Sequence, residues 1–372
     1  MFTPKVVDTE TSARTGNLRL HHGDVRTPAF MPVGTNGTVK AISHETLEEI
    51  GYDLILGNTY HLYIRPGTEV IENAGGLHAF SGWRGNILTD SGGYQVFSLA
   101  RLRTIDDEGV RFQSHIDGAY HTFTPESVID IQHILGSDVL MPLDVCTPPG
   151  IGRKEALDAL KTTTDWARRS KRRLEEYRGF YGRLFGIVQG NFYADLRRRS
   201  AEEIASLDLP GIAVGGLSVG EEAEQFYDFL ALTAEQLPAE KPRYVMGIGT
   251  PEYVLAAVEN GIDIFDCVFP TRIARNSSVF TRRGVLSLKK EENLLDTDPI
   301  DPECGCPVCR RYSRSYLRHL FKIREILGPM LATEHNLYFF HRFMEEVRDS
   351  IDRGSFALYK RNFLNRYAEG PL

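Results

Sequence analysis

Eight short apolar runs recur along the chain, and each is bounded by polar or glycine-rich residues. Most are followed by a stretch with helical periodicity, such as Val128, Ile131 and Leu135. Buried apolar strands that alternate with helices are typical of a parallel sheet covered on both faces. The pattern therefore predicts an α/β fold, namely an irregular (β/α)8 TIM barrel. The runs are Ala29–Val33, Leu54–Leu56, Ile87–Leu88, Val139–Leu143, Leu184–Val188, Ile212–Val214, Tyr244–Ile248 and Ile262–Val268.

An open, doubly wound sheet is the alternative architecture for this pattern. It is disfavoured because the spacing continues without a break and no Gly-x-Gly-x-x-Gly motif follows the first strand. Two stretches interrupt the regularity: 98–123, whose alternating residues predict inserted strands, and 272–341, which replaces a simple last helix. The first residues predict a polar hairpin that turns at Arg14–Asn17.

Composition indicates a soluble globular protein. The chain has 372 residues, of which 42% are hydrophobic, so it can bury a large core. The N-terminus lacks the basic and then apolar run of a signal peptide, and no stretch approaches the roughly 20 apolar residues of a membrane span. We therefore expect a cytoplasmic protein with no membrane partner.

Charge is distributed unevenly along the chain. The net charge of −7 argues against a general nucleic-acid binder, whose domain is normally basic. However, residues 271–372 hold 18 Lys and Arg against 13 Asp and Glu, so the C-terminal part is positive and the rest is acidic. If a polyanion binds, it is expected to bind the C-terminal third.

Polar side chains follow several of the predicted strands, where barrel enzymes build their active sites. The acids are Asp90, Asp144 and Asp266. For any one of them, a cap or a satisfied buried carboxylate is the simpler explanation. Three acids in one barrel mouth favour catalysis, because exchange at an anomeric carbon uses one carboxylate as nucleophile and another as acid.

Other residues near these strand ends suit a purine base. Asp144 and Gln189 offer acceptors and donors that match a base edge, and Gly215-Gly216-Leu217 offers backbone N–H groups. Tyr94 and Met246 could cover the two faces of the ring. The glycines have a simpler interpretation as a tight turn.

A cluster of cysteines predicts a metal site. Cys304, Cys306 and Cys309 are followed by His335, which gives the closed Cys3His set of structural zinc. His319 or His341 could replace His335 as the fourth ligand. With no open position for water, the metal is expected to stabilise the fold rather than take part in chemistry.

These motifs resemble those of bacterial tRNA-guanine transglycosylases over essentially the whole chain. The resemblance implies a (β/α)8 barrel with an inserted C-terminal zinc-binding subdomain. It divides the chain into the main barrel with its N-terminal hairpin (1–271), a zinc-binding, tRNA-contacting subdomain (272–345) and a helical segment that completes the barrel (346–372). The matching segments are Asp90–Gln95, Gly186–Gly190, Gly215–Glu221, Phe265–Val268, Pro270–Arg272 and the four predicted metal ligands.

The resemblance also implies an activity. Members of the family exchange guanine at the wobble position of tRNA for a 7-deazaguanine, a step in queuosine biosynthesis. Asp266 would be the nucleophile that forms a covalent ribosyl-enzyme, and Asp90 the general acid/base. Arg272 and Arg275 would hold the anticodon loop, one Zn²⁺ would be bound per chain, and the protein would be a homodimer. The residues implied in base binding are Asp144, Gln189, Gly215, Gly216, Leu217, Tyr94, Met246, Cys146 and Glu221.

The chain departs from the usual family pattern at two places, of which the first touches the base pocket. Leu143-Asp144-Val145-Cys146 stands where Phe-Asp-Glu-Cys is usual, and Ser277-Ser278 stands where glycine is usual. Cys146 and Val219 resemble enzymes that take the aminomethyl base preQ1, so preQ1 is the predicted incoming base and queuine the alternative. A non-catalytic RNA-binding partner of the family would be expected to lack one of the acids, and a metal-dependent hydrolase would place histidines at the strand ends.

Overall fold

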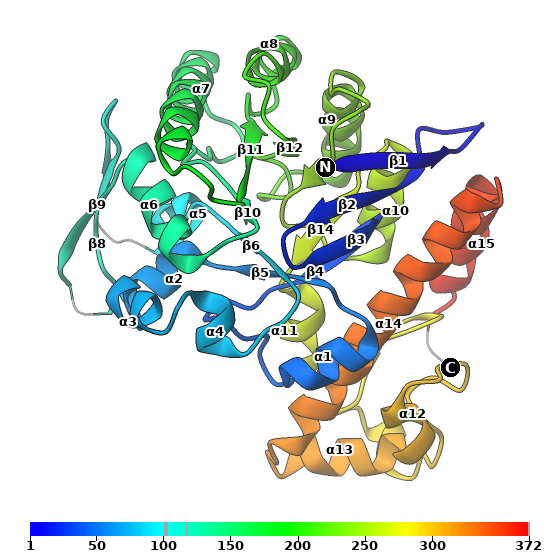
Figure 1. Ribbon diagram of the computed structural model, residues 1–372. Helices are drawn as coiled ribbons and strands as arrows, with labels where there is room; N and C mark the ends of the chain where they lie inside the picture. Colours follow the sequence, from blue (N-terminus) through cyan, green and yellow to red (C-terminus); the bar gives the residue numbers. More distant parts are fainter. Residues whose placement is uncertain (100–102, 117, 371–372) are drawn as a thin grey trace.

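The computed structural model describes residues 1–99, 103–116 and 118–370. Eight parallel strands follow one another in chain order around a barrel (Figure 1). A parallel bridge between Val33 and Leu56 joins the first strand to the second and closes the ring. This closure confirms the predicted barrel and excludes the open sheet. The strands are β4 (Ala29–Pro32), β5 (Leu54–Gly57), β6 (Asn86–Thr89), β10 (Val139–Leu140), β11 (Arg183–Val188), β12 (Gly211–Val214), β13 (Arg243–Val245) and β14 (Ile264–Cys267).

Alternate residues of each strand face the barrel interior and the surrounding helices. Tyr244 and Ile264 belong to the interior cluster, whereas their neighbours Val245 and Phe265 pack with the helices. The same alternation turns Asp266 towards the interior at the end of β14. The parity of a single strand thus fixes which side of the barrel wall this carboxylate occupies.

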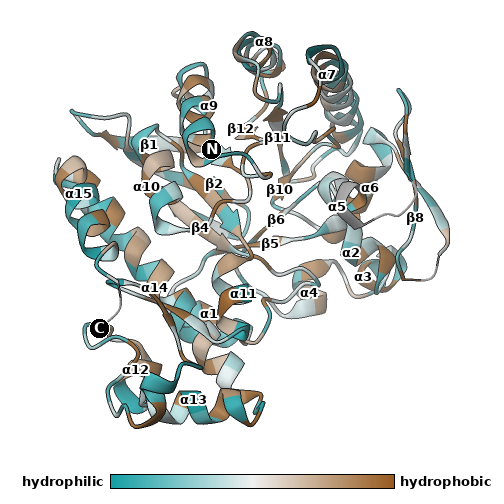
Figure 2. Ribbon diagram, turned by 180° about the vertical axis from the view of Figure 1, so that it is seen from behind, coloured by the Kyte–Doolittle hydropathy of each residue, from teal (hydrophilic) through white to brown (hydrophobic). Residues whose placement is uncertain are grey.

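Helices cover the outside of the barrel, with hydrophilic residues prominent on the outer helices and hydrophobic residues along the strands (Figure 2). Two of them, α6 and α10, begin after Thr124 and Thr250 with proline at the first position, where its fixed φ suits the start of a helix. None of the helices in the described ranges is long and apolar enough to cross a membrane. These helices are α1 (His44–Ile50), α2 (Thr59–Ile64), α3 (Thr68–Asn73), α4 (Leu77–Ser81), α5 (Gly93–Leu99), α6 (Pro125–Leu135), α7 (Arg153–Glu176), α8 (Ala194–Ala205), α9 (Ala223–Glu235) and α10 (Pro251–Glu259).

The N-terminal segment differs from the prediction. It forms a three-stranded antiparallel sheet of β1 (Phe2–Val7), β2 (Arg14–Leu20) and β3 (Gly23–Thr27). The predicted turn at Arg14–Asn17 is wrong, because these residues lie within β2. Arg14 is buried and its guanidinium pairs with Asp263 at 2.6 Å, a partner far away in the sequence. Arg14, which suggested a turn, therefore forms an ion pair between distant parts of the chain.

The predicted strand insertion is confirmed. Strands β7 (Arg103–Ile105), β8 (Val110–Gln113) and β9 (Tyr120–Phe123) form a separate antiparallel sheet between α5 and α6. By contrast, the run predicted as a strand over Val139–Leu143 pairs only at β10. Pro142 has no N–H to donate, and Met141 donates its N–H to the Gln132 side chain at 3.0 Å instead.

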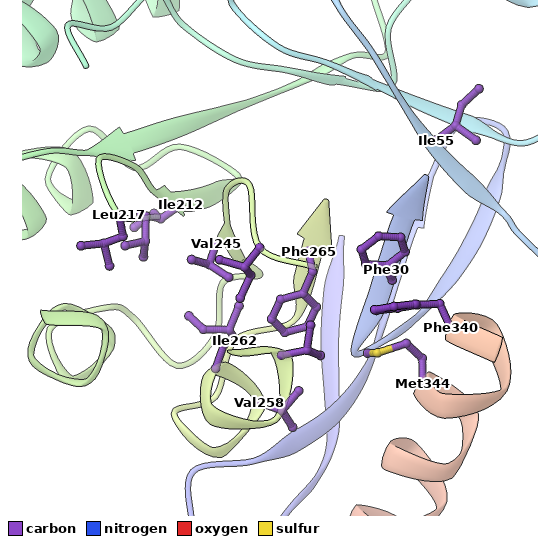
Figure 3. Close-up of a cluster of buried hydrophobic side chains, with 14 of the residues drawn as sticks. Phe30, Ile55, Ile212, Leu217, Val245, Val258, Ile262, Phe265, Phe340 and Met344 are labelled. Atoms are coloured by element: carbon purple, nitrogen blue, oxygen red, sulfur yellow. The ribbon is translucent and has the colours of Figure 1, made fainter. Parts of the chain in front are cut away.

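The C-terminal part replaces a simple last helix, as predicted. Helix α14 packs against the barrel, with Phe340 and Met344 directed towards Phe30 of β4 (Figure 3). The proposed domain limit at residue 345 falls inside α14, which continues unbroken across it, so the three-part division stays a prediction. The elements here are α11 (Phe269–Arg275), β15 (Ser278–Thr281), β16 (Gly284–Ser287), the 3-10 helix η1 (Glu291–Leu294), α12 (Pro307–Arg311), α13 (Arg314–Lys322), α14 (Leu327–Asp352) and α15 (Phe356–Tyr367).

Candidate active site

Asp266 has one carboxylate oxygen held and one available. Oδ1 accepts hydrogen bonds from the Tyr244 hydroxyl at 2.5 Å and from the Gly247 N–H at 2.9 Å. Oδ2 receives no hydrogen bond from the residues that the structure describes. Burial raises the pKa of this carboxyl, while the two hydrogen bonds lower it. An oriented and poorly solvated carboxylate oxygen has the properties of a nucleophile.

Asp90 follows β6 and is surrounded by donors. Oδ2 accepts from the side-chain amides of Asn58 at 2.5 Å and Gln95 at 2.8 Å. Oδ1 accepts from the Thr59 N–H at 2.9 Å and the Gly92 N–H at 3.2 Å. Burial raises its pKa to about 6 against these hydrogen bonds, and the charge of Asp266 adds to the rise. The two carboxylates therefore lie within electrostatic reach of each other.

Asp144 and Gln189 form a hydrogen-bonded pair. The Gln189 Nε2 donates to Asp144 Oδ2 at 2.8 Å, and the Ser91 hydroxyl donates to Oδ1 at 3.3 Å. Burial raises the pKa of Asp144 to about 6. The Oε1 of Gln189 is buried and accepts no hydrogen bond from the described residues. A buried acceptor of this kind normally has a partner, so it marks a position that a bound molecule can satisfy.

The loop after β12 passes close to Gln189. A Cβ on Gly216 would lie 2.5 Å from Gln189 Oε1, and one on Gly215 would lie 2.8 Å from its Nε2. Gly216 also has φ of +65°, a conformation that favours glycine. Farther along, Glu221 accepts hydrogen bonds from the N–H groups of Ser218 and Val219. At both glycines the backbone thus lies so close to Gln189 that a Cβ would fit only if a neighbouring side chain shifted.

The remaining predicted base-binding residues lie near these groups. Tyr94 is 52% exposed at the start of α5, so its ring is available as a platform. Met246 follows β13 and packs partly against the interior cluster. Burial, with the nearby charge of Asp144, raises the pKa of Cys146 to about 12, so this thiol is protonated at neutral pH. Base binding by these three side chains stays a prediction.

Two arginines lie on α11, the helix that follows β14. Arg272 is exposed, and Arg275 donates to the Thr271 carbonyl at 2.9 Å. Burial and the positive charge of Arg272 lower the pKa of Arg275. Neither guanidinium has an acidic partner within 4.0 Å among the described residues. Two adjacent unpaired cations favour an anionic ligand.

The predicted metal ligands converge. His335 Nδ1 lies 3.9, 3.4 and 3.3 Å from the Sγ atoms of Cys304, Cys306 and Cys309. Ligands of a tetrahedral ion with bonds of 2.0–2.3 Å are about 3.5 Å apart, so the cluster fits such an ion. The His335 Nε2 donates to the Phe280 carbonyl at 2.7 Å, which leaves Nδ1 as the ligand atom. This cluster can hold a metal ion.

His22, His78 and Asp138 form a second group of possible metal ligands, near the N-terminal ends of the barrel strands. Hydrogen bonding explains this group better than metal binding does. His22 Nδ1 lies 2.8 Å from Asp138, and His78 Nε2 lies 3.3 Å from the same carboxylate. His78 Nε2 also lies 3.1 Å from the Gly85 carbonyl, an acceptor that requires a protonated ring nitrogen. A protonated nitrogen cannot be a metal ligand, so the three side chains tie the β2–β3 turn to the barrel floor.

The sequence did not identify several residues that support the site. Asn58 and Tyr244 hold Asp90 and Asp266, and Arg197 binds the loop after β12. Signals for them exist in the sequence. Asn58 comes two residues after the predicted strand Leu54–Leu56, and Tyr244 shares the parity of Met246. Arg197 occupies the face of α8 that also carries buried Ser200, Ala201 and Ile204.

Comparisons with known proteins agree with this geometry. The family described as queuine tRNA-ribosyltransferase matches residues 8–369. A protein of that name from Borrelia duttonii is 52% identical over 376 residues, which cover all of both chains. One from Treponema denticola is 52% identical over 368 residues, covering 99% of this chain and 97% of the relative. One from Caldanaerobacter subterraneus is 51% identical over 360 residues, covering 97% and 96%. With a family match over almost its whole length, a barrel of the expected form and the acids of the family motifs at its strand ends, the chain belongs to the queuine tRNA-ribosyltransferase family.

Proposed function

We propose that this glycosyltransferase exchanges guanine at the wobble position of tRNA for preQ1, through a covalent ribosyl-enzyme intermediate, in queuosine biosynthesis. The observation that carries the proposal is the state of Asp266: Oδ1 is fixed by Tyr244 and Gly247, and Oδ2 is available beside a second buried acid, Asp90. A flipped-out nucleotide is required for a base to reach such a site.

Two displacement steps account for the exchange. Asp266 Oδ2 attacks C1′ of the ribose as the C1′–N9 bond breaks, and Asp90 in its protonated form gives its proton to the departing guanine. Asp90 then takes the N9 proton of the incoming base, whose N9 attacks C1′ and releases Asp266. The proton balance is zero over the cycle. A pKa of about 6 suits Asp90 to both directions of proton transfer.

Base recognition is proposed for the groups around Gln189. Asp144 would accept the N1–H and exocyclic amine of the base, and backbone N–H groups of the Gly215–Leu217 loop would donate to its carbonyl oxygen. The Glu221 carboxylate accepts the N–H of the Leu217–Ser218 peptide, which turns the Leu217 carbonyl the other way. That carbonyl would accept the aminomethyl group of preQ1.

The identity of the incoming base is tested by competition. With labelled tRNA, preQ1 is expected to replace guanine, and queuine is expected to exchange at least about tenfold more slowly because its larger substituent must fit beside Cys146 and Val219. Efficient exchange of queuine would support the alternative base. Absence of exchange with any base would support a non-catalytic RNA-binding role.

Activity should fall on the acid side of neutrality. Burial raises the pKa of Asp90 and Asp144 to about 6. In the covalent intermediate Asp90 must be ionised to take the N9 proton of the incoming base, and Asp144 must be ionised to accept hydrogen bonds from its N1–H and amine. We expect kcat/KM for preQ1 to be constant above about pH 7 and to decline below about pH 6.

Because both pKa values are raised on folding, these carboxyls favour the folded state most below their unfolded value of 3.8, and this stabilisation is lost as pH rises through about 6.

The pH profile of kcat/KM for preQ1 checks this expectation, with the melting temperature recorded at each pH. A decline centred near pH 4 would show that these carboxyls ionise normally. In Asp144→Asn the acid limb is expected to become less steep, because one of the two titrating groups has been removed.

Replacement of Arg272 by Ala is expected to weaken tRNA binding by about 3- to 10-fold and to leave binding of the free base unchanged. A single lost phosphate contact also lowers the slope of log K against log salt by roughly 0.7–0.9. Arg168→Ala is a charge-matched control, since Arg168 lies on α7 and is paired with Asp165. Equal losses of tRNA and base affinity would argue against an RNA contact for Arg272.

Zinc is the proposed metal, with one structural ion per chain. The support is the Cys3His set itself, its spacing and its closed geometry. The site is remote from the strand ends in sequence, and no step of the exchange involves it. The resemblance further supports a homodimer, which sedimentation would test, and a tRNA substrate supports the predicted cytoplasmic location.

A further inference from the structure

Arg197 is a buried cation whose hydrogen bonds go to backbone carbonyls. It lies on α8 with 0% of its surface exposed, and among the described residues no carboxylate comes within 4.0 Å of it. Its guanidinium donates instead to backbone carbonyls: Asn191 at 2.8 Å, Gly215 at 2.7 Å and Gly216 at 3.1 Å. Burying a charge in this way is costly, and burial lowers the pKa of Arg197 to about 10. A charge buried at this cost is expected to have a function, and its contacts with Gly215 and Gly216 point to the loop after β12.

The peptide geometry of the loop indicates that function. In the loop, the Gly215–Gly216 and Gly216–Leu217 peptides are both trans, so the N–H of each points away from the carbonyl that binds Arg197. These N–H groups belong to Gly216 and Leu217. Neither donates a hydrogen bond within the part of the chain that is described. Two consecutive donors are therefore directed away from Arg197, and none of the described residues accepts from them.

The next peptide is held from the other direction. Glu221 accepts the N–H of Ser218, which directs the Leu217 carbonyl away from Glu221. A buried cation thus holds two carbonyls and a carboxylate holds the following N–H. The loop presents two donors and then one acceptor, and each orientation is set by a charged side chain.

We propose that Arg197 is a positioning residue that fixes the two N–H donors of Gly216 and Leu217 for the carbonyl oxygen of the substrate base. The inference rests on the proposed function and adds a residue that decides which base is accepted. Without the guanidinium, the Gly215–Gly216 and Gly216–Leu217 peptides are free to rotate, because glycine at both positions imposes little restraint. A rotated peptide would present a carbonyl, which repels the oxygen of guanine.

The test compares guanine with 6-thioguanine as competitive inhibitors of exchange. The thio compound keeps the N1–H and amine edge but replaces the oxygen by sulfur, a weak acceptor. For the wild-type protein we expect guanine to bind roughly 10- to 100-fold more tightly, in keeping with lost hydrogen bonds to an unsatisfied buried group. In Arg197→Met the ratio should fall to within about 3-fold, mainly through weaker guanine binding.

Arg243→Met is the matched control. Arg243 is also buried, and its guanidinium binds the carbonyls of Leu237 and Pro238, but it is the first residue of β13 and so lies at the other end of the barrel from the loop after β12. We expect it to lower the melting temperature and to leave the guanine to 6-thioguanine ratio unchanged. If Arg197→Met does not fold, Arg197→Lys, which keeps the charge but loses the planar fork, should show a partial fall of the ratio.

The outcomes are distinguishable. An unchanged ratio in a folded Arg197 variant would overturn the positioning role, because a merely structural arginine would weaken both bases equally. If the wild-type protein binds neither base, the proposed function itself fails. Millimolar guanidinium added to Arg197→Ala should restore part of the preference for guanine, whereas a general loss of packing would not respond.

Discussion

Asp266→Asn is expected to slow guanine exchange by at least about 10⁴-fold, equivalent to about 5 kcal/mol of transition-state stabilisation. An amide oxygen is a poor nucleophile and cannot balance the positive charge that develops on the ribose. The covalent RNA adduct seen on denaturing gels should also disappear. The melting temperature should be unchanged or higher, since burial disfavours the ionised carboxylate that the substitution removes.

Asp263→Asn provides a matched control in the same segment. Asp263 is a fully buried aspartate directly before β14, and it accepts two hydrogen bonds from Arg14, at 2.9 and 2.6 Å. Its replacement should cost about 3–5 kcal/mol of stability, because an unpaired buried arginine remains. The folded fraction should still form the adduct. Adduct at the wild-type level in Asp266→Asn would remove the nucleophile assignment.

Cys306→Ser is expected to release the metal and to unfold the C-terminal region before the barrel. Cys306 is fully buried and its side chain belongs to a small hydrophobic core with Val279, Leu286 and Leu317. So small a core cannot hold this region alone, and structural zinc contributes on the order of 10 kcal/mol in small domains. Elemental analysis should give one zinc per wild-type chain and none in the variant. Hydrogen exchange should show lost protection over 278–322 first.

Loss of the metal should also disturb the proposed RNA contacts, Arg272 and Arg275 of α11. Ala274 of α11 packs in the same core as Cys306, and the Asn336 side chain of α14 donates to the Pro270 carbonyl at 2.9 Å. Metal release is therefore expected to abolish tRNA binding while the barrel still binds free base. Cys146→Ser, which removes a thiol outside the cluster, should keep the metal. A metal-free variant with full activity would contradict a structural role.

Much of the fold could be predicted because barrel strands are local features. Each strand is a short apolar run, and its position in the barrel follows its order in the chain. The strand ends then gave Asp90, Asp144, Gln189 and Asp266, since residues at the ends of parallel strands meet at one face. The predicted turn at Arg14–Asn17 is wrong because the deciding contact is not local. The buried ion pair of Arg14 joins β2 to a residue 249 positions later.

The sequence by itself determined which strands form, in what order, and which acids stand at their ends, because apolar periodicity and turn residues act over a few positions. Only the tertiary structure decided how those acids are held. Asn58 reaches Asp90 across 32 positions, Tyr244 reaches Asp266 across 22, and Arg197 reaches Gly216 across 19. A hydrogen bond between strands or helices depends on distances and angles that closing the barrel creates. No local pattern encodes which carbonyl a buried arginine will meet.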